Sequence, residues 1–271
     1  MDGTALLCES CGYCLAGLPR SGNCPECGRA IHTSLPDARI GSPWQRAAGI
    51  RSAIVTNLMV LSRPADLFER VRIDPTRGRG LMVLNLAVAG AVLIDPWVGV
   101  LAGDPLRRAG HQSLPRWLLA YGATWAIEVG CGIALLLALT YVEVLGVRFF
   151  AARRGWRLTR DAAWQVCAHA SVGWIVAGFL PFMALAALAA LERWFHWAPH
   201  GELKLAPVVA TPIAWQQIAY VGLLLGGFVG GMLVFEGLVY VGVRRCRFAN
   251  PPVAGEPREA PARAAAEAPR V

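Results

Sequence analysis

Charged residues are scarce in this chain. They make up 16% of its 271 residues, whereas 55% are hydrophobic and the mean hydropathy is +0.45. An ordinary soluble domain carries about 25% charged residues, so this composition is too apolar for that class. The first residues, Met1 to Cys14, also lack the basic start and apolar run of a secretory signal peptide, and we expect no such leader. The composition therefore predicts an integral membrane protein.

Common catalytic motifs are missing as well. The sequence contains no His-Glu-x-x-His helix, no Gly-x-Ser-x-Gly elbow and no Walker loop. No nucleophile lies beside a base in a pattern that would predict covalent catalysis. We therefore expect that the protein is not an enzyme.

Two cysteine knuckles near the start of the chain are its most specific motif. Cys8-Glu-Ser-Cys11-Gly and Cys24-Pro-Glu-Cys27-Gly each place two thiols on one tight turn. The glycine after each pair lets the backbone adopt positive φ, so that backbone amides face the sulfurs. Two facing knuckles form a four-thiolate cage that orders a segment too short to fold by hydrophobic burial alone. The spacing predicts a metal site formed by Cys8, Cys11, Cys24 and Cys27.

A fifth cysteine, Cys14, forms a second Cys-x-x-Cys with Cys11. Leu15 rather than glycine follows Cys14, so we interpret Cys14 as a spare thiol beside the cage. Disulfides are the weaker alternative, because five local cysteines leave one unpaired. Iron is an alternative to zinc, since the knuckles also resemble those of rubredoxin. The short loop between them holds no aromatic residue beyond Tyr13 to shield a redox centre. We therefore favour structural Zn²⁺.

Four apolar runs follow, each longer than the roughly 20 residues that cross a bilayer as a helix. They extend from Leu81 to about Leu101, from Trp117 to Val147, from Ala162 to Leu191 and from Ile213 to Val243. We predict an all-α integral membrane bundle of four spans with a small N-terminal zinc-ribbon module. The predicted organisation is a zinc ribbon at 1–36, amphipathic juxtamembrane helices and linker at 37–79, a four-span membrane domain at 80–247 and a disordered tail at 248–271.

The segment 43–73 has the pattern of two short amphipathic helices. Ile50, Ile54, Leu58 and Leu61 recur at helical spacing, and Pro64 is suited to open a second helix. The apolar face of that second helix consists of Leu67, Phe68 and Val71. Nearby arginines favour contact with an anionic leaflet. Packing on the ribbon or on the bundle is an equally good interpretation.

The orientation follows from the cationic residues near the span ends. Fourteen lie before the first span, between the second and third, and after the fourth: Arg63, Arg70, Arg72, Arg77, Arg79, Arg148, Arg153, Arg154, Arg157, Arg160, Arg244, Arg245, Arg247 and Arg258. Five lie in the other two loops: Arg107, Arg108, Arg116, Arg193 and Lys204. This bias predicts a cytoplasmic (inner) membrane protein with both termini in the cytoplasm. A reducing compartment also suits a thiolate cage.

Three titratable residues lie inside the apolar runs at similar depth. Counting about 1.5 Å per helical residue from the flanking arginines puts Glu143 roughly 8 Å deep, and His169 and Glu236 roughly 12–14 Å deep. Gln165 lies one turn from His169 on the same helix face. Such residues are costly in a membrane and suggest a proton- or cation-binding cluster. The more frequent role is a structural one, in which they pair with one another or with Arg148 and Arg244.

Gly222, Gly226 and Gly230, with Gly227 and Gly231 beside them, form a small-residue face on the last span. Such faces let helices approach closely, within a bundle or between protomers. We predict close packing here, through which a homo-oligomer could also form.

Net charge of +8 could indicate nucleic acid as a partner, but its distribution argues against this. Residues 1–36 carry three acidic residues against two arginines, so the ribbon by itself is close to neutral. A ribbon without a basic face offers no phosphate-binding surface. We expect no nucleic acid partner; the lipid bilayer and a protein are the expected partners.

The string from Cys8 to Pro19, followed by Cys24-Pro-Glu-Cys27-Gly, resembles a small zinc ribbon found at the start of many bacterial proteins. From Ser62-Arg-Pro-Ala-Asp-Leu-Phe onward, the layout is similar to Yip1-type membrane domains, which usually carry five spans. That resemblance implies membrane organisation through protein partners. We therefore expect a membrane adaptor or scaffold whose zinc ribbon presents a cytoplasmic protein-binding surface. The alternative is a proton- or cation-coupled transporter or channel that uses Glu143, His169 and Glu236.

Overall fold

The computed structural model describes residues 5–74, 76–102, 114–195 and 215–251. After the ribbon come two 3-10 turns, η1 (Ile31–Ser34) and η2 (Pro36–Ala38), and three short helices, α1 (Pro43–Arg46), α2 (Ile50–Ser62) and α3 (Pro64–Arg70). The long helices are α4 (Arg79–Ala102), α6 (Leu114–Arg153), α8 (Val172–Phe195) and α9 (Trp215–Cys246), with α7 (Arg160–Ala170) directly before α8. The described residues contain only helices and isolated β-bridges, in agreement with the predicted all-α class.

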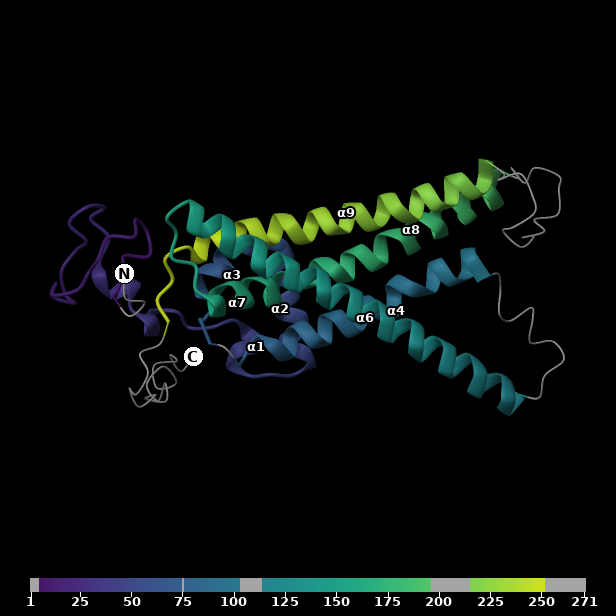
Figure 1. Ribbon diagram of the computed structural model, residues 1–271, viewed down its shortest axis with the longest axis horizontal. Helices are drawn as coiled ribbons and strands as arrows, with labels where there is room; N and C mark the ends of the chain where they lie inside the picture. The colour runs from purple at the N-terminus through teal and green to yellow at the C-terminus, as the bar shows by residue number, and fades with distance from the viewer. Residues whose placement is uncertain (1–4, 75, 103–113, 196–214, 252–271) are drawn as a thin grey trace, which may run out of the picture.

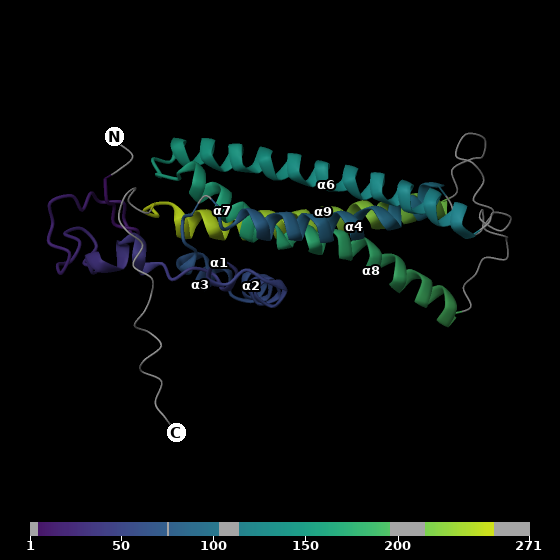
Figure 2. The ribbon, with the colours of Figure 1, turned by 90° about the horizontal axis from the view of Figure 1, so that it is seen from below.

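The long helices lie side by side, and the ribbon lies at one end of them (Figures 1 and 2). We call this the ribbon end. Three stretches of helix in the described residues are long and apolar enough to cross a membrane: Trp125–Arg153, Arg160–Ala184 and Val221–Cys246. These correspond to the second, third and fourth predicted spans. The first predicted span falls on α4, whose described apolar stretch, Arg79–Leu93, is shorter than the 18 residues taken as the minimum for a membrane crossing. The structure therefore supports a membrane protein with three candidate spans, and the fourth stays a prediction.

The core of the bundle is centred on α8. Trp174 is buried and stacks on Phe235 of α9, with 4.5 Å between the ring centroids. Its indole Nε1 donates a hydrogen bond of 2.9 Å to Thr140 Oγ1 on α6. The only polar atom of this large side chain is thereby satisfied inside an apolar core. Trp174 thus links α6, α8 and α9.

Glycines allow α9 to lie directly against α8. A Cβ on Gly231 would lie 2.1 Å from the Cα of Ala177, and one on Gly227 would lie 2.7 Å from the backbone of Pro181. By contrast, a Cβ on Gly222 or Gly226 would meet nothing within 4 Å. The close contact within the bundle therefore uses the glycines beside the predicted Gly222, Gly226 and Gly230 face, of which the first two are exposed. Close helix packing through small residues is the expected physical role of such positions.

The segment 43–73 was predicted either to lie on the membrane surface or to pack on the ribbon or the bundle, and its short helices show features of both. Helix α3 packs against α9, and its Leu67 and Phe68 are fully buried in the core of the bundle. Helix α2 crosses the long helices near the ribbon end (Figures 1 and 2) and turns Ala53, Thr56 and Val60 inward. Its predicted apolar stripe faces outward instead: Ile50, Ile54, Leu58 and Leu61 are all exposed. An exposed apolar stripe on a helix flanked by arginines has the character of a membrane-interface helix.

The predicted disordered tail begins at residue 248, and most of it lies outside the described residues. The described part, up to Pro251, is ordered: Ala249 and Asn250 are buried.

Candidate functional site

The ribbon is built from two knuckles related by a shift of sixteen residues. In the first, the amide of Gly12 donates to the carbonyl of Cys8 (2.8 Å), and in the second Gly28 donates to Cys24 in the same way (2.9 Å). Isolated antiparallel bridges occupy matching places, Leu7 with Cys14 and Asn23 with Ala30. The two glycines have φ of 84° and 71°, the left-handed region that the spacing predicts for them.

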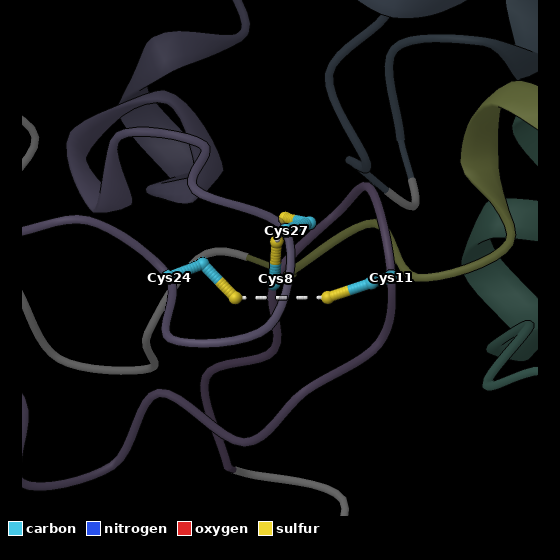
Figure 3. Close-up of side chains that lie close together, drawn as sticks. All are labelled: Cys8, Cys11, Cys24 and Cys27. Carbon is cyan, nitrogen blue, oxygen red and sulfur yellow. Dashed lines mark hydrogen bonds between the residues drawn. The ribbon is translucent and has the colours of Figure 1, made fainter.

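The knuckles bring the four predicted cysteines together (Figure 3). The Sγ atoms of Cys8 and Cys27 are 3.5 Å apart, and those of Cys11 and Cys24 are 3.6 Å apart. All four sulfur atoms lie within 4.8 Å of one another. A tetrahedral site with metal–sulfur bonds of about 2.3 Å has sulfur–sulfur edges of about 3.8 Å. The donor set and its dimensions therefore fit one tetrahedral metal ion. Both zinc and iron accept four thiolates in this arrangement.

The thiols of the cage interact with one another and with the surrounding backbone. Burial raises the pKa of Cys11 to about 12. Burial also acts to raise the pKa of Cys8, but hydrogen bonds from the backbone of Cys11 and Ser10 outweigh it and lower this pKa to about 7. Backbone amides thus face a sulfur, as the knuckle geometry requires.

Cys14 lies outside the cage. It is exposed, whereas Cys8 and Cys24 are buried in the small core of the ribbon with Leu15 and Ile31. In the sixteen-residue repeat Cys14 corresponds to Ala30, so it occupies a position at which the second knuckle has no thiol. Such a small core gives the ribbon little hydrophobic stabilisation.

The first knuckle is docked on the ribbon end of the bundle through Asn250. The side-chain Oδ1 of Asn250 accepts from the amide of Leu7 (3.0 Å) and from Arg157 Nη2 (2.5 Å). Its Nδ2 donates to the carbonyls of Leu7 (2.8 Å) and Ser34 (2.7 Å). One buried amide therefore joins the ribbon, the segment after α9 and the α6–α7 connection.

An ion pair strengthens the same junction. Arg39 is 3% exposed, and its guanidinium lies 3.0 Å from the carboxylate of Glu9. It also donates to the carbonyls of Phe68 (2.8 Å) and Val71 (3.1 Å) at the end of α3, and to that of Arg245 (3.1 Å) on α9. A buried ion pair is stabilising only when its remaining hydrogen-bonding capacity is satisfied, as it is here.

The two knuckles consequently differ in exposure. Phe248 lies over the first knuckle, where a Cβ on Gly12 would be 2.8 Å from its ring. A Cβ on Gly28 would meet nothing within 4 Å, and the second-knuckle residues from Pro25 to Arg29 are all exposed. One knuckle therefore attaches the ribbon, and the other presents a free surface.

The polar residues of the long helices fall into two groups. Glu143 of α6 and Glu236 of α9 are half-buried, and their carboxyl groups interact electrostatically. Cys167 of α7 is buried near both. Two facing carboxyl groups can share a proton or hold a cation.

His169 and Gln165 belong to a separate network. The Nδ1 of His169 lies 2.8 Å from the carbonyl of Gln165, and its Nε2 lies 3.0 Å from Ser42 Oγ. The amide of Gln165 donates to the carbonyl of Asp74 and accepts from Gln45 (3.1 Å). This network fastens the segments around α1 and before α4 to α7. The structure therefore brings Glu143 and Glu236 together and gives His169 and Gln165 partners from another part of the chain.

Sequence reasoning missed the residues that dock the ribbon. Asn250 is a single asparagine in the segment predicted to be a disordered tail. Arg157 was considered only as one of the cationic residues near the span ends, and Arg39 not at all. No spacing or motif distinguishes them, because their partners lie up to 243 residues away along the chain.

A comparison with family models, curated proteins and solved structures finds no match to this chain. The resemblances to bacterial zinc ribbons and to Yip1-type domains therefore stay predictions. The fold and the site define a class: a helical protein with helices of membrane-spanning length and a four-cysteine cluster that could bind a metal ion.

Proposed function

We propose that this chain is an integral membrane adaptor with a structural Zn²⁺ ion, whose ribbon offers its second knuckle to a protein partner. The protein would cross the cytoplasmic membrane four times, with α4 as the first span and both termini in the cytoplasm. It would act by binding rather than by catalysis.

The observation that carries this proposal is the asymmetry of the ribbon. The first knuckle is covered by Phe248, and its Ser10 carbonyl accepts from Arg247 (2.7 Å), whereas the second knuckle is free. A cage with four protein thiolates leaves no open coordination position for a substrate, which favours a structural metal. A rigid turn held at a fixed place above a bilayer suits recognition of a partner.

A photo-reactive residue tests the proposal directly. Placed at Glu26, on the exposed second knuckle, it should form a specific adduct in intact membranes. Placed at Ser10, on the docked knuckle, it should form none. The Glu26 adduct should disappear in Cys24→Ser, because that variant disrupts the cage. Identical adducts at both positions, or none at either, would refute the adaptor function.

A second candidate is supported by the pairing of Glu143 with Glu236. In this function the pair binds a proton or a cation within the membrane, and His169 has only a structural role. The double variant Glu143→Gln, Glu236→Gln should then abolish proton- or cation-coupled flux in liposomes. An adaptor would keep its Glu26 adduct in the same variant, so the two measurements separate the candidates.

A further inference from the structure

A cavity of about 370 Å³ lies where the ribbon meets the end of α9. Both parts contribute to its lining, and α3 adds Glu69. The lining is rich in arginine: Arg29 and Arg39 come from the ribbon and its linker, Arg244 and Arg245 come from the last turn of α9, and Arg247 follows directly after it. His32, Thr33 and Ser10 supply further polar groups.

The acidic residues of the lining already have partners. Glu9 pairs with Arg39 at 3.0 Å, and Glu69 pairs with Arg245. Five arginines against two glutamates leave a formal charge of +3 with His32 neutral. The cavity therefore has a positive electrostatic potential. The low-dielectric protein around a cleft concentrates such a potential, which attracts anions.

The other three guanidinium groups contact neutral groups. Arg29 Nε donates to Thr33 Oγ1 (3.2 Å), and Arg244 Nη1 donates to the hydroxyl of Tyr240 (3.2 Å). Arg247 Nη2 donates to the carbonyl of Ser10. Each guanidinium has five N–H groups, so all three keep donors for a ligand. Arginine forks match the oxygens of a phosphate group in geometry and charge.

The charge of the ribbon by itself does not describe this cavity. Residues 1–36 alone are close to neutral, but docking places the arginines of α9 beside Arg29 and His32. The site exists only in the assembled structure, which is why charge counting along the sequence missed it.

We propose that this cavity binds a phosphate-bearing anion. Its position next to the last apolar residues of α9 suits the headgroup of an anionic phospholipid, and its opening would also admit a soluble phosphate compound. The shared chemistry is a phosphate held between guanidinium groups of the ribbon and of α9.

The test uses the full-length protein in a neutral detergent with two probes. Native mass spectrometry compares dioleoyl phosphatidylglycerol with dioleoyl phosphatidylcholine, and titration calorimetry measures inorganic pyrophosphate. The variant Arg29→Gln, Arg244→Gln removes one guanidinium from each side of the cavity. The control Arg20→Gln, Arg153→Gln removes the same charge from exposed arginines outside it.

The cavity variant should weaken binding about tenfold or more, because it removes charge-assisted hydrogen bonds, and the control should change binding less than about twofold. Binding of phosphatidylglycerol alone identifies a lipid headgroup, and binding of pyrophosphate identifies a soluble anion; either supports the site. Binding of neither probe, or equal weakening in both variants, overturns it. If the double variant loses its fold, the single variant Arg29→Gln is compared with Arg20→Gln in the same binding measurements. Both side chains are exposed, so neither substitution should disturb the fold.

Discussion

Replacing Asn250 with alanine should undock the ribbon without emptying its cage. The side chain makes four hydrogen bonds across the junction. At about 1 kcal/mol net for each bond, the docked state should lose about 3–4 kcal/mol. Since 1.4 kcal/mol corresponds to a factor of ten, the undocked fraction should rise about 10²- to 10³-fold.

Trypsin cleavage between Arg247 and Phe248 reports this fraction. The segment after α9 is held against the ribbon, so cleavage there requires local opening, and its rate follows the open population when reclosing is fast. The rate should rise with the undocked fraction in Asn250→Ala, while the metal content per chain stays unchanged. Asn23→Ala is the matched control, because Asn23 is an exposed asparagine of the ribbon.

Two results would refute this reasoning. If Asn250→Ala is cleaved no faster than Asn23→Ala, the asparagine does not hold the junction. If Asn250→Ala loses its metal as well, the knuckles depend on docking rather than on their own cage.

Three further substitutions test the cage, the junction and the bundle. Cys24→Ser should lose the bound metal, as measured by metal analysis of the purified protein, and full occupancy would contradict the cage. Gly12→Ala should destabilise docking more than Gly28→Ala in the same cleavage assay, because both glycines have positive φ but only the first lies beneath an aromatic ring. Equal effects of the two substitutions would mean that backbone strain alone acts and that the contact with Phe248 does not hold the ribbon. Gly231→Val should lower the midpoint of thermal unfolding, since its side chain would collide with α8, whereas Gly222→Val should leave it nearly unchanged; a similar fall in both would contradict the observed packing.

The cage could be predicted because its determinants are local. Cys8, Cys11, Cys24 and Cys27 lie within twenty residues, and the turn geometry of each knuckle follows from its own spacing. The apolar runs were likewise readable from composition. Local signals therefore located the four-cysteine cluster and the candidate spans.

The partners of the polar residues could not be predicted in the same way. Residue counting gives depth along a helix but not the direction in which a side chain points. Glu143 and His169 were expected in one layer, yet one faces Glu236 and the other faces Ser42. The stripe on α2 shows the same limit: its period predicted a helix, but not that Ile54 would point outward.

The contact between Leu7 and Asn250 has a consequence for biogenesis. These residues are 243 positions apart, so the surface that receives the ribbon does not exist until α9 has been synthesised. The ribbon is synthesised first, so it has to fold before its docking surface is complete. Docking is then the last step of assembly, and it joins the start of the chain to its last long helix. A truncated product that lacks the segment after α9 would carry a folded ribbon with nowhere to attach.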